Sequence, residues 1–129
     1  MALPLEGVRV IDLTNVLAGP YCGMVLGDLG ADVIKIERFP DGDASRRFDP
    51  QIAGESYCFT VVNRNKRSIA LDLKSPRGKA VFMKLAADAD IVLENFRPGV
   101  VRRLGIDYEQ LRGINPGVVY ASMSLSLIH

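Results

Sequence analysis

The sequence predicts an α/β fold built on a doubly wound, Rossmann-like parallel sheet. Short runs rich in β-branched residues recur along the 129-residue chain, and helix-like stretches separate them. The hydrophobic content of 48% is enough to fill a substantial core. Strands that alternate with helices are expected to pair in parallel through right-handed crossovers, which place helices on both faces of the sheet.

The first predicted unit is a strand, a loop and a helix. Residues 8–13 form a strand-like run, residues 14–20 are small and polar, and an apolar stretch continues through Leu29. Pro20 suits the first position of a helix, and Gly30 suits the left-handed residue that ends one. This unit therefore predicts one strand followed by a crossover helix.

The second strand, residues 32–36, leads into residues 37–57, which are rich in Asp, Gly, Pro and Arg and lack periodicity. An irregular segment of this length is uncommon in a compact domain and often lines a site or wraps a partner. A basic loop, residues 63–67, precedes a third strand at residues 68–73. We interpret this loop as a surface loop or an inter-subunit contact, because it lacks the interleaved aromatic residues of a nucleic-acid patch.

The next predicted helix covers residues 75–87, with Ser75 as N-cap and Pro76 at the first position. We expect its buried face to contain Val81, Leu85 and either Met83 or Phe82. Residues 91–93 form a fourth strand, followed by a short helix that ends near Gly105. A helical turn capped by Asp107 and a fifth strand, residues 118–122, complete the pattern.

Composition excludes several functional classes. Lysine and arginine total 16 against 15 acidic residues, so a net charge of +1 gives no general reason to expect nucleic acid or an anionic membrane as a partner. No apolar run approaches the ~20 residues of a membrane span, and the start lacks the features of a secretory signal, so we expect a cytoplasmic protein. Cys22 and Cys58 fit neither a metal cluster nor a CxxC pair, which predicts free, packed thiols and no metal site.

Ligands of doubly wound sheets bind beyond the carboxyl ends of the strands. The loop after the first strand leads to a helix start whose free amides can bind an anion, although Thr14 or Asn15 can equally satisfy a tight turn there. After the second strand, Glu37 would suit a ribose hydroxyl and Arg38 a phosphate. The sequence contains neither G-x-G-x-x-G nor a Walker lysine, so neither nucleotide motif is matched.

Further candidates follow the third and fourth strands. Lys74 precedes a helix start, where a lysine opposes the helix dipole unless it is solvated or a phosphate binds. Phe96 can stack on a purine or belong to the core, with Asn95 beside it. The basic residues at this edge are Arg38, Lys74, Arg97 and Arg103. Their clustering in a nearly neutral chain predicts a polyphosphate ligand that bears an adenine.

A series of motifs at these positions resembles the class III (CaiB/BaiF-type) CoA transferases and their racemase relatives over nearly the whole chain. The motifs occupy residues 4–14, 17–20, 29–37, 42–43, 63–69, 71–74 and 94–99. The resemblance implies that coenzyme A, as an acyl-CoA substrate, lies along the carboxyl edge. The binding residues that it implies are Leu17, Ala18, Arg38, Leu71, Asp72, Leu73, Lys74, Asn95, Phe96, Arg97 and Arg103.

The resemblance also implies a reaction. Members of the family move CoA between carboxylic acids: an aspartate attacks the acyl-CoA thioester, and a mixed anhydride and then an enzyme-bound thioester follow. The racemase branch instead deprotonates the carbon beside the thioester. After Ser124 the family continues with a glycine-rich loop and the aspartate, whereas this chain has residues 125–129. No catalytic residue is assigned, because none of Asp12, Asp28, Asp32, Asp72 and Asp107 matches that aspartate.

We therefore expect residues 1–129 to be the N-terminal, Rossmann-like CoA-binding part of a CoA transferase domain, incomplete relative to the family and inactive alone. The resemblance implies interlocked homodimers, but interlocking is not expected of a chain that lacks the second domain. The alternatives are a noncatalytic dinucleotide-binding or assembly module, supported by Glu37, a racemase-lineage fragment, and a nonfunctional fragment that aggregates. The sequence leaves the acyl group and the acceptor acid open.

Overall fold

A five-stranded parallel sheet forms the centre of the molecule, as the sequence predicts. The computed structural model describes residues 2–124. The strands lie in the order β5-β2-β1-β6-β7 and all pair in parallel. Their bounds are Arg9–Asp12 for β1, Asp32–Arg38 for β2, Lys66–Leu71 for β5, Ile91–Glu94 for β6 and Val119–Ser122 for β7.

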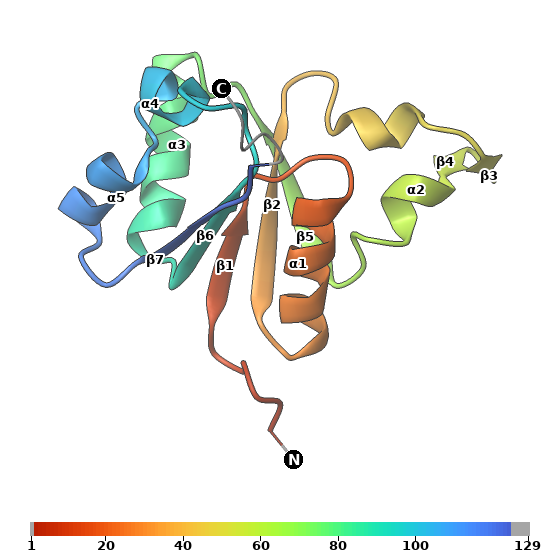
Figure 1. The fold of residues 1–129 in the computed structure, drawn as a ribbon, viewed down its shortest axis with the longest axis horizontal. Coiled ribbons are helices and arrows are strands. Elements are labelled where there is room, and N and C mark those ends of the chain that lie inside the picture. Colours follow the sequence, from red (N-terminus) through yellow and green to blue (C-terminus); the bar gives the residue numbers. More distant parts are fainter. Residues whose placement is uncertain (1, 125–129) are drawn as a thin grey trace.

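Helices cover both faces of this sheet (Figure 1). Helix α1, Ala18–Asp28, lies on one face, and α3, α4 and α5 lie on the other. These three helices span Pro76–Ala87, Val100–Leu104 and Tyr108–Ile114. Successive residues of β1 point to opposite faces, so Val10 packs in the cluster under α1 and Ile11 in the cluster under α3 and α5. The doubly wound architecture is therefore confirmed.

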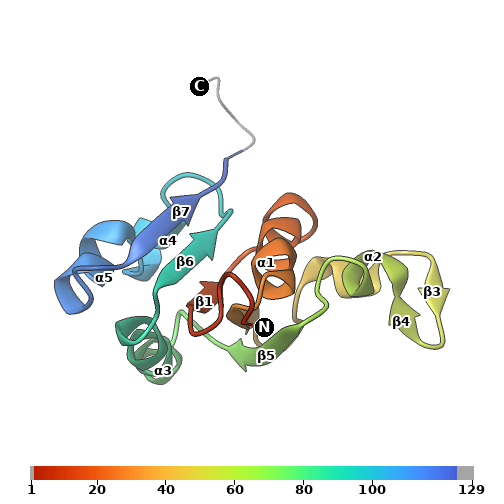
Figure 2. The same cartoon turned by 90° about the horizontal axis from the view of Figure 1, so that it is seen from below.

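The segment after β2 forms a small projection beside α1 (Figure 2). It contains a 3-10 turn at Ala44–Arg47, the two-stranded hairpin of β3 and β4, and the short helix α2. The bounds of the last three elements are Gln51–Ile52, Glu55–Ser56 and Tyr57–Thr60. The irregular character predicted for residues 37–57 is thus correct in outline, since each element within it is only two to four residues long.

The predicted helix caps are confirmed at two positions. Ser75 accepts a hydrogen bond from the backbone N–H of Gly78, with Pro76 in the first position of α3, and Asp107 caps α5 in the same way. The prediction for Pro20 was two residues late, because α1 begins at Ala18. Pro20 still lies in the first turn, where its missing N–H leaves no helical bond unmade.

The buried face of α3 agrees with the expectation for Phe82 and Leu85, which pack in or against the core, but not for Val81. Phe82 and Ala86 are fully buried against the sheet, whereas Val81 is 40% exposed. Both cysteines are free and half-buried, as expected. Within residues 2–124, no helix is long and apolar enough to cross a membrane.

Candidate functional site

The loops after β1 and β6 meet at the carboxyl edge of the sheet, where the chain turns to opposite faces. The side chain of Asn95 joins them: its amide nitrogen donates to the Asn15 carbonyl at 2.9 Å, and its oxygen accepts the Asn15 N–H at 2.9 Å. The side-chain amide of Asn95 thus pairs with the backbone of Asn15 as a peptide group of a neighbouring strand would. Asn95 therefore shapes the site by fixing the neighbouring loop.

A hollow of about 800 Å³ opens between these loops. It is lined by Asn15 to Ala18 after β1, Asn95 to Pro98 after β6, and Met123 and Ser124 after β7. The structure thus brings together five of the residues that the sequence singled out: Leu17, Ala18, Asn95, Phe96 and Arg97. Leu17 is 61% exposed. Phe96 lines the hollow and also packs against the core, which agrees with the core role considered for it.

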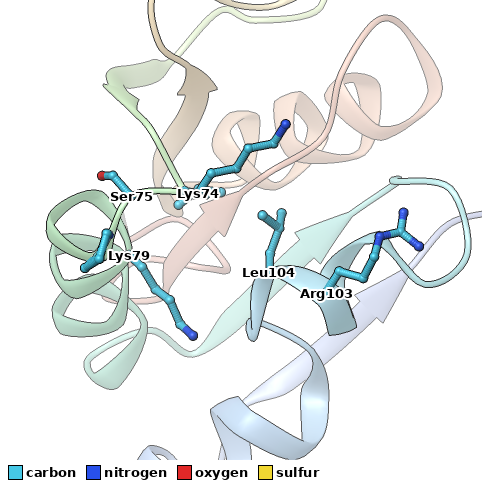
Figure 3. A pocket seen from close by; sticks show the side chains of 7 residues that line it. Lys74, Ser75, Lys79, Arg103 and Leu104 are labelled. Atoms are coloured by element: carbon cyan, nitrogen blue, oxygen red, sulfur yellow. The ribbon is translucent and has the colours of Figure 1, made fainter.

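A second hollow, of about 410 Å³, lies between the start of α3 and the end of α4 (Figure 3). Its lining residues are Leu73, Lys74, Ser75, Pro76, Lys79, Arg103 and Leu104. Leu73, Lys74 and Arg103 were predicted from the sequence. In Figure 3, the side chains of Lys74 and Arg103 extend toward the same side of the hollow, and that of Lys79 extends the other way.

Lys79 was not singled out from the sequence, although it lies one turn after Ser75 on α3. An ideal Cβ atom at Gly105 would come within 2.3 Å of its Nζ atom, so the ammonium group lies directly over the residue that ends α4. A cation is favourable at a helix C-terminus. The position of Lys79 therefore has a structural explanation in the dipole of α4. Arg103 shares this explanation because it lies in the last turn of α4, whereas Lys74 does not.

The remaining predicted residues lie on the β5 and β2 side of the edge. Arg38 ends β2 in register with Leu71, and its exposed guanidinium donates to Asp41 at 3.1 Å. Leu71 packs on the core, and Asp72 accepts from the Lys74 backbone N–H, which shapes the turn into α3. Arg38, Leu71 and Asp72 are not among the residues that line the two hollows described above.

A network of buried charges lies beneath the β1–α1 loop, and sequence reasoning missed it. Lys35 Nζ is 2.9 Å from Asp43 Oδ2, and Lys66 Nζ is 2.8 Å from Asp12 Oδ2, with every one of these side chains at most 2% exposed. Charged residues inside a central parallel strand are unusual, because such strands are buried on both faces. Lys35 within β2 was therefore the signal that could have predicted a buried ion pair.

Glu37 belongs to the same network and is fully engaged. Its carboxylate accepts from the guanidinium of Arg46 at 2.7 and 2.6 Å, from the Asp43 backbone N–H at 2.8 Å, and from the Ser68 hydroxyl. Burial alone would raise its pKa, but the hydrogen bonds from Arg46, Ser68 and Asp43 lower it to about 2. Glu37 therefore presents no free carboxylate to a ribose, which removes the main support for a dinucleotide site.

Asp43 and Lys66 of this network also have shifted pKa values. Burial opposes ionisation of Asp43, yet the charge of Lys35 and the hydrogen bonds from Lys35 and Ser45 hold the pKa of Asp43 below its usual value. Burial lowers the pKa of Lys66, and Asp12 partly offsets this effect. These groups are held in fixed ion pairs, which suits a structural role.

The basic residues of segment 63–67 are also paired with carboxylates elsewhere in the fold. The predicted loop is two residues too long, because β5 begins at Lys66 and ends at Leu71 rather than spanning residues 68–73. Arg64 donates to both carboxylate oxygens of Asp28, at 3.0 and 2.6 Å, and Arg67 contacts Asp32 at 2.7 Å. Lys66 is buried against Asp12. The loop therefore ties β5 to α1 and β2, and its positive charge is largely neutralised.

Comparison with known proteins identifies the family. The model of CoA-transferase family III matches residues 5–125. The chain belongs to this family. It is 49% identical over 122 residues to a mouse succinyl-CoA:glutarate CoA-transferase, covering 94% of this chain and 28% of the relative. It is also 49% identical to an acetyl-CoA:oxalate CoA-transferase of Acetobacter aceti, covering 94% and 31%.

A solved structure shows the same fold. A CaiB/BaiF family protein from Brucella suis superposes with a TM-score of 0.89 at 42% identity, covering 95% of this chain and 33% of that one. The chain thus spans about a third or less of the length of these relatives. Residues 125–129, where we expect the sequence to depart from the family pattern, lie outside the described residues.

Proposed function

We propose that this chain forms the coenzyme A-binding part of a family III CoA-transferase, and that the whole enzyme moves CoA between carboxylic acids through an aspartyl intermediate. The observation that carries the proposal is the placement of Lys74 and Arg103 on one hollow at the carboxyl edge. Among residues 2–124, neither Lys74 nor Arg103 forms an ion pair, and two such cations suit the phosphates of CoA.

The larger hollow, of about 800 Å³, supplies contacts of another kind. The start of α1 has no side-chain cap, so its first amides remain for a polar ligand group, and Leu17 beside them offers an exposed apolar surface. Phe96 and Arg97 face the same space from the β6 side. This combination of apolar and polar lining fits a long, flexible thioester substrate better than a compact anion.

The buried carboxylates support binding rather than chemistry for this part of the enzyme. Asp12, Asp43 and Glu37 lie near the edge, but each is held in an ion pair and at most 4% exposed. A carboxylate that attacks a thioester must reach the reacting carbon with a free oxygen. We therefore assign no catalytic residue among these three. The carboxylic acids named for the relatives, glutarate and oxalate, suggest a small dicarboxylate as acceptor.

Calorimetry with CoA tests the proposal on the 129-residue chain. We expect saturable binding, and a Lys74→Ala/Arg103→Ala variant should bind at least about tenfold more weakly, because hydrogen bonds to charged groups contribute roughly 1.5–3 kcal/mol each. Arg112→Ala is the matched control, since Arg112 is an exposed cation on α5 paired with Glu109. An absence of saturable heat, or equal affinity of the double variant and the parent chain, would contradict the proposal.

A further inference from the structure

The turn between β1 and α1 has a backbone conformation that its own sequence does not favour. Val16 has a φ of +74°, in the left-handed region that β-branched residues rarely adopt. Such a conformation persists only where the surroundings fix it. Asn95 holds Asn15 on one side of Val16, so the question is what holds the rest of the turn.

The buried pair of Lys35 and Asp43 forms hydrogen bonds with the backbone of the turn. The carboxylate of Asp43 accepts the backbone N–H of Val16 at 3.2 and 3.3 Å. The ammonium group of Lys35 donates to the carbonyl of Thr14 at 2.8 Å and pairs with Asp43 at 2.9 Å. The two side chains therefore contact the backbone on both sides of Asn15.

Asp43 is also held in place by hydrogen bonds with residues outside the turn. Its Oδ1 atom accepts from the backbone N–H and the hydroxyl of Ser45, at 2.9 and 2.8 Å, and its own N–H donates to Glu37 at 2.8 Å. The projection after β2 is thereby coupled to a loop that lies far from it in the sequence. Stability alone does not explain this arrangement, because a buried ion pair is often no more stabilising than well-packed apolar side chains.

The loop that the pair holds contributes Asn15, Val16, Leu17 and Ala18 to the larger hollow. We propose that Lys35 and Asp43 are positioning residues for CoA binding, which keep Val16 at positive φ and so aim Leu17 and Ala18 at the ligand. This inference rests on the proposed function. Without the pair, Val16 relaxes to a negative φ and the loop no longer lines the hollow in the binding conformation.

A matched pair of double variants tests the inference. Lys35→Met/Asp43→Leu removes the acceptor of the Val16 N–H without leaving either charge buried alone. Lys35→Met/Asp43→Asn removes the same charges but keeps a carbonyl oxygen toward Val16 and Ser45. We expect the first to bind CoA at least about tenfold more weakly than the parent chain and the second to stay within about threefold, as measured by calorimetry.

The backbone at Val16 gives an independent readout. The strong intraresidue HN–Hα NOE of a residue with positive φ should be lost in Lys35→Met/Asp43→Leu and kept in Lys35→Met/Asp43→Asn. Leu111→Ala controls for general destabilisation, because Leu111 of α5 is fully buried in the core on the face of the sheet opposite α1. This control should lower the thermal midpoint yet change CoA affinity by less than about twofold.

The outcomes separate the two proposals. If the parent chain does not bind CoA, the proposed function fails. If the parent chain binds CoA and the Lys35→Met/Asp43→Leu variant keeps the same affinity, the positioning role is overturned while CoA binding stands. The same holds if this variant loses no more CoA affinity than a Leu111→Ala variant of equal stability. Should that double variant not fold, Lys35→Met/Asp43→Ala removes the same acceptor of the Val16 N–H, again without leaving either charge buried alone. This variant is expected to bind CoA at least about threefold more weakly than Lys35→Met/Asp43→Asn, and equal affinity of the two would overturn the inference.

Discussion

Protonation of the Glu37 carboxylate is coupled to the folding of the chain. Its side chain is 4% exposed, and its pKa is lowered from 4.5 to about 2 by hydrogen bonds that outweigh the effect of burial. A group whose pKa falls on folding stabilises the folded state above its unfolded pKa, and this contribution is lost as the pH falls through the folded value. The stabilisation is therefore complete above about pH 5 and declines toward pH 2.

We predict that Glu37→Gln lowers the free energy of unfolding by about 2–3 kcal/mol at pH 7 and by much less at pH 3. Urea unfolding at both pH values measures this difference. Glu109→Gln is the control, because Glu109 is exposed on α5 and contacts only Arg112 among the ion pairs described. An equal loss at pH 7 and pH 3 would show that the effect comes from packing and not from the charge.

Single residues also mark the limit of what the sequence predicted. The positions of Lys74, Arg97 and Arg103 beside the two hollows were predictable, because these residues follow strands whose carboxyl ends share one edge. This rule needs only the strand order. The pairing of Asp12 with Lys66 was not found, because it joins residues from opposite parts of the chain. Local patterns carry no information about which distant partner neutralises a buried charge.

At the scale of elements, α1 approaches β1 so closely that only glycine fits between them. An ideal Cβ atom at Gly23 would lie 2.5 Å from Asp12 Oδ2 and 3.2 Å from Lys66 Nζ. We predict that Gly23→Ala destabilises the chain by about 1–2 kcal/mol, because overpacking against a fixed ion pair exceeds the ~1 kcal/mol gain in helix propensity. Thermal unfolding followed by circular dichroism measures the change.

Gly113 in α5 is the matched position for this test. A Cβ atom there would meet nothing within 4 Å, so Gly113→Ala should stabilise the chain by about 0.5–1 kcal/mol. A glycine-to-alanine substitution is thus expected to lower the stability of the chain in α1 and to raise it in α5. If both variants were stabilised, the close approach of α1 to the Asp12 pair would not restrict this position.

The regular elements were predictable from sequence to within one or two residues, and the projection was not. The strands carry runs of β-branched residues, and α3 and α5 carry side-chain caps that mark their starts. Between β2 and β5, the turn and the hairpin have no periodicity of their own. Contacts of Glu37 and Asp43 with the turn at Ala44–Arg47 fix that segment, and such contacts form only in the folded chain.

For the whole molecule, doubly wound topology explains why residues from separate motifs share one edge. The strand order brings the loops after β1, β6 and β7 around the larger hollow, while α3 and α4 enclose the smaller one on a single face. A ligand that spans both hollows would bridge segments from residue 15 to residue 124. Its binding should therefore stabilise the fold as a unit.

We predict that CoA raises the thermal midpoint of the 129-residue chain and that NAD does not. A ligand at ten times its Kd adds about 1.4 kcal/mol to the stability of the folded state, which corresponds to a rise of roughly 4–6 °C for a chain of this size. The shift should fall by more than half in Lys74→Ala/Arg103→Ala and stay unchanged in Arg112→Ala. A larger rise with NAD than with CoA would instead favour a dinucleotide site, and it would require the buried Glu37 to leave Arg46 on binding.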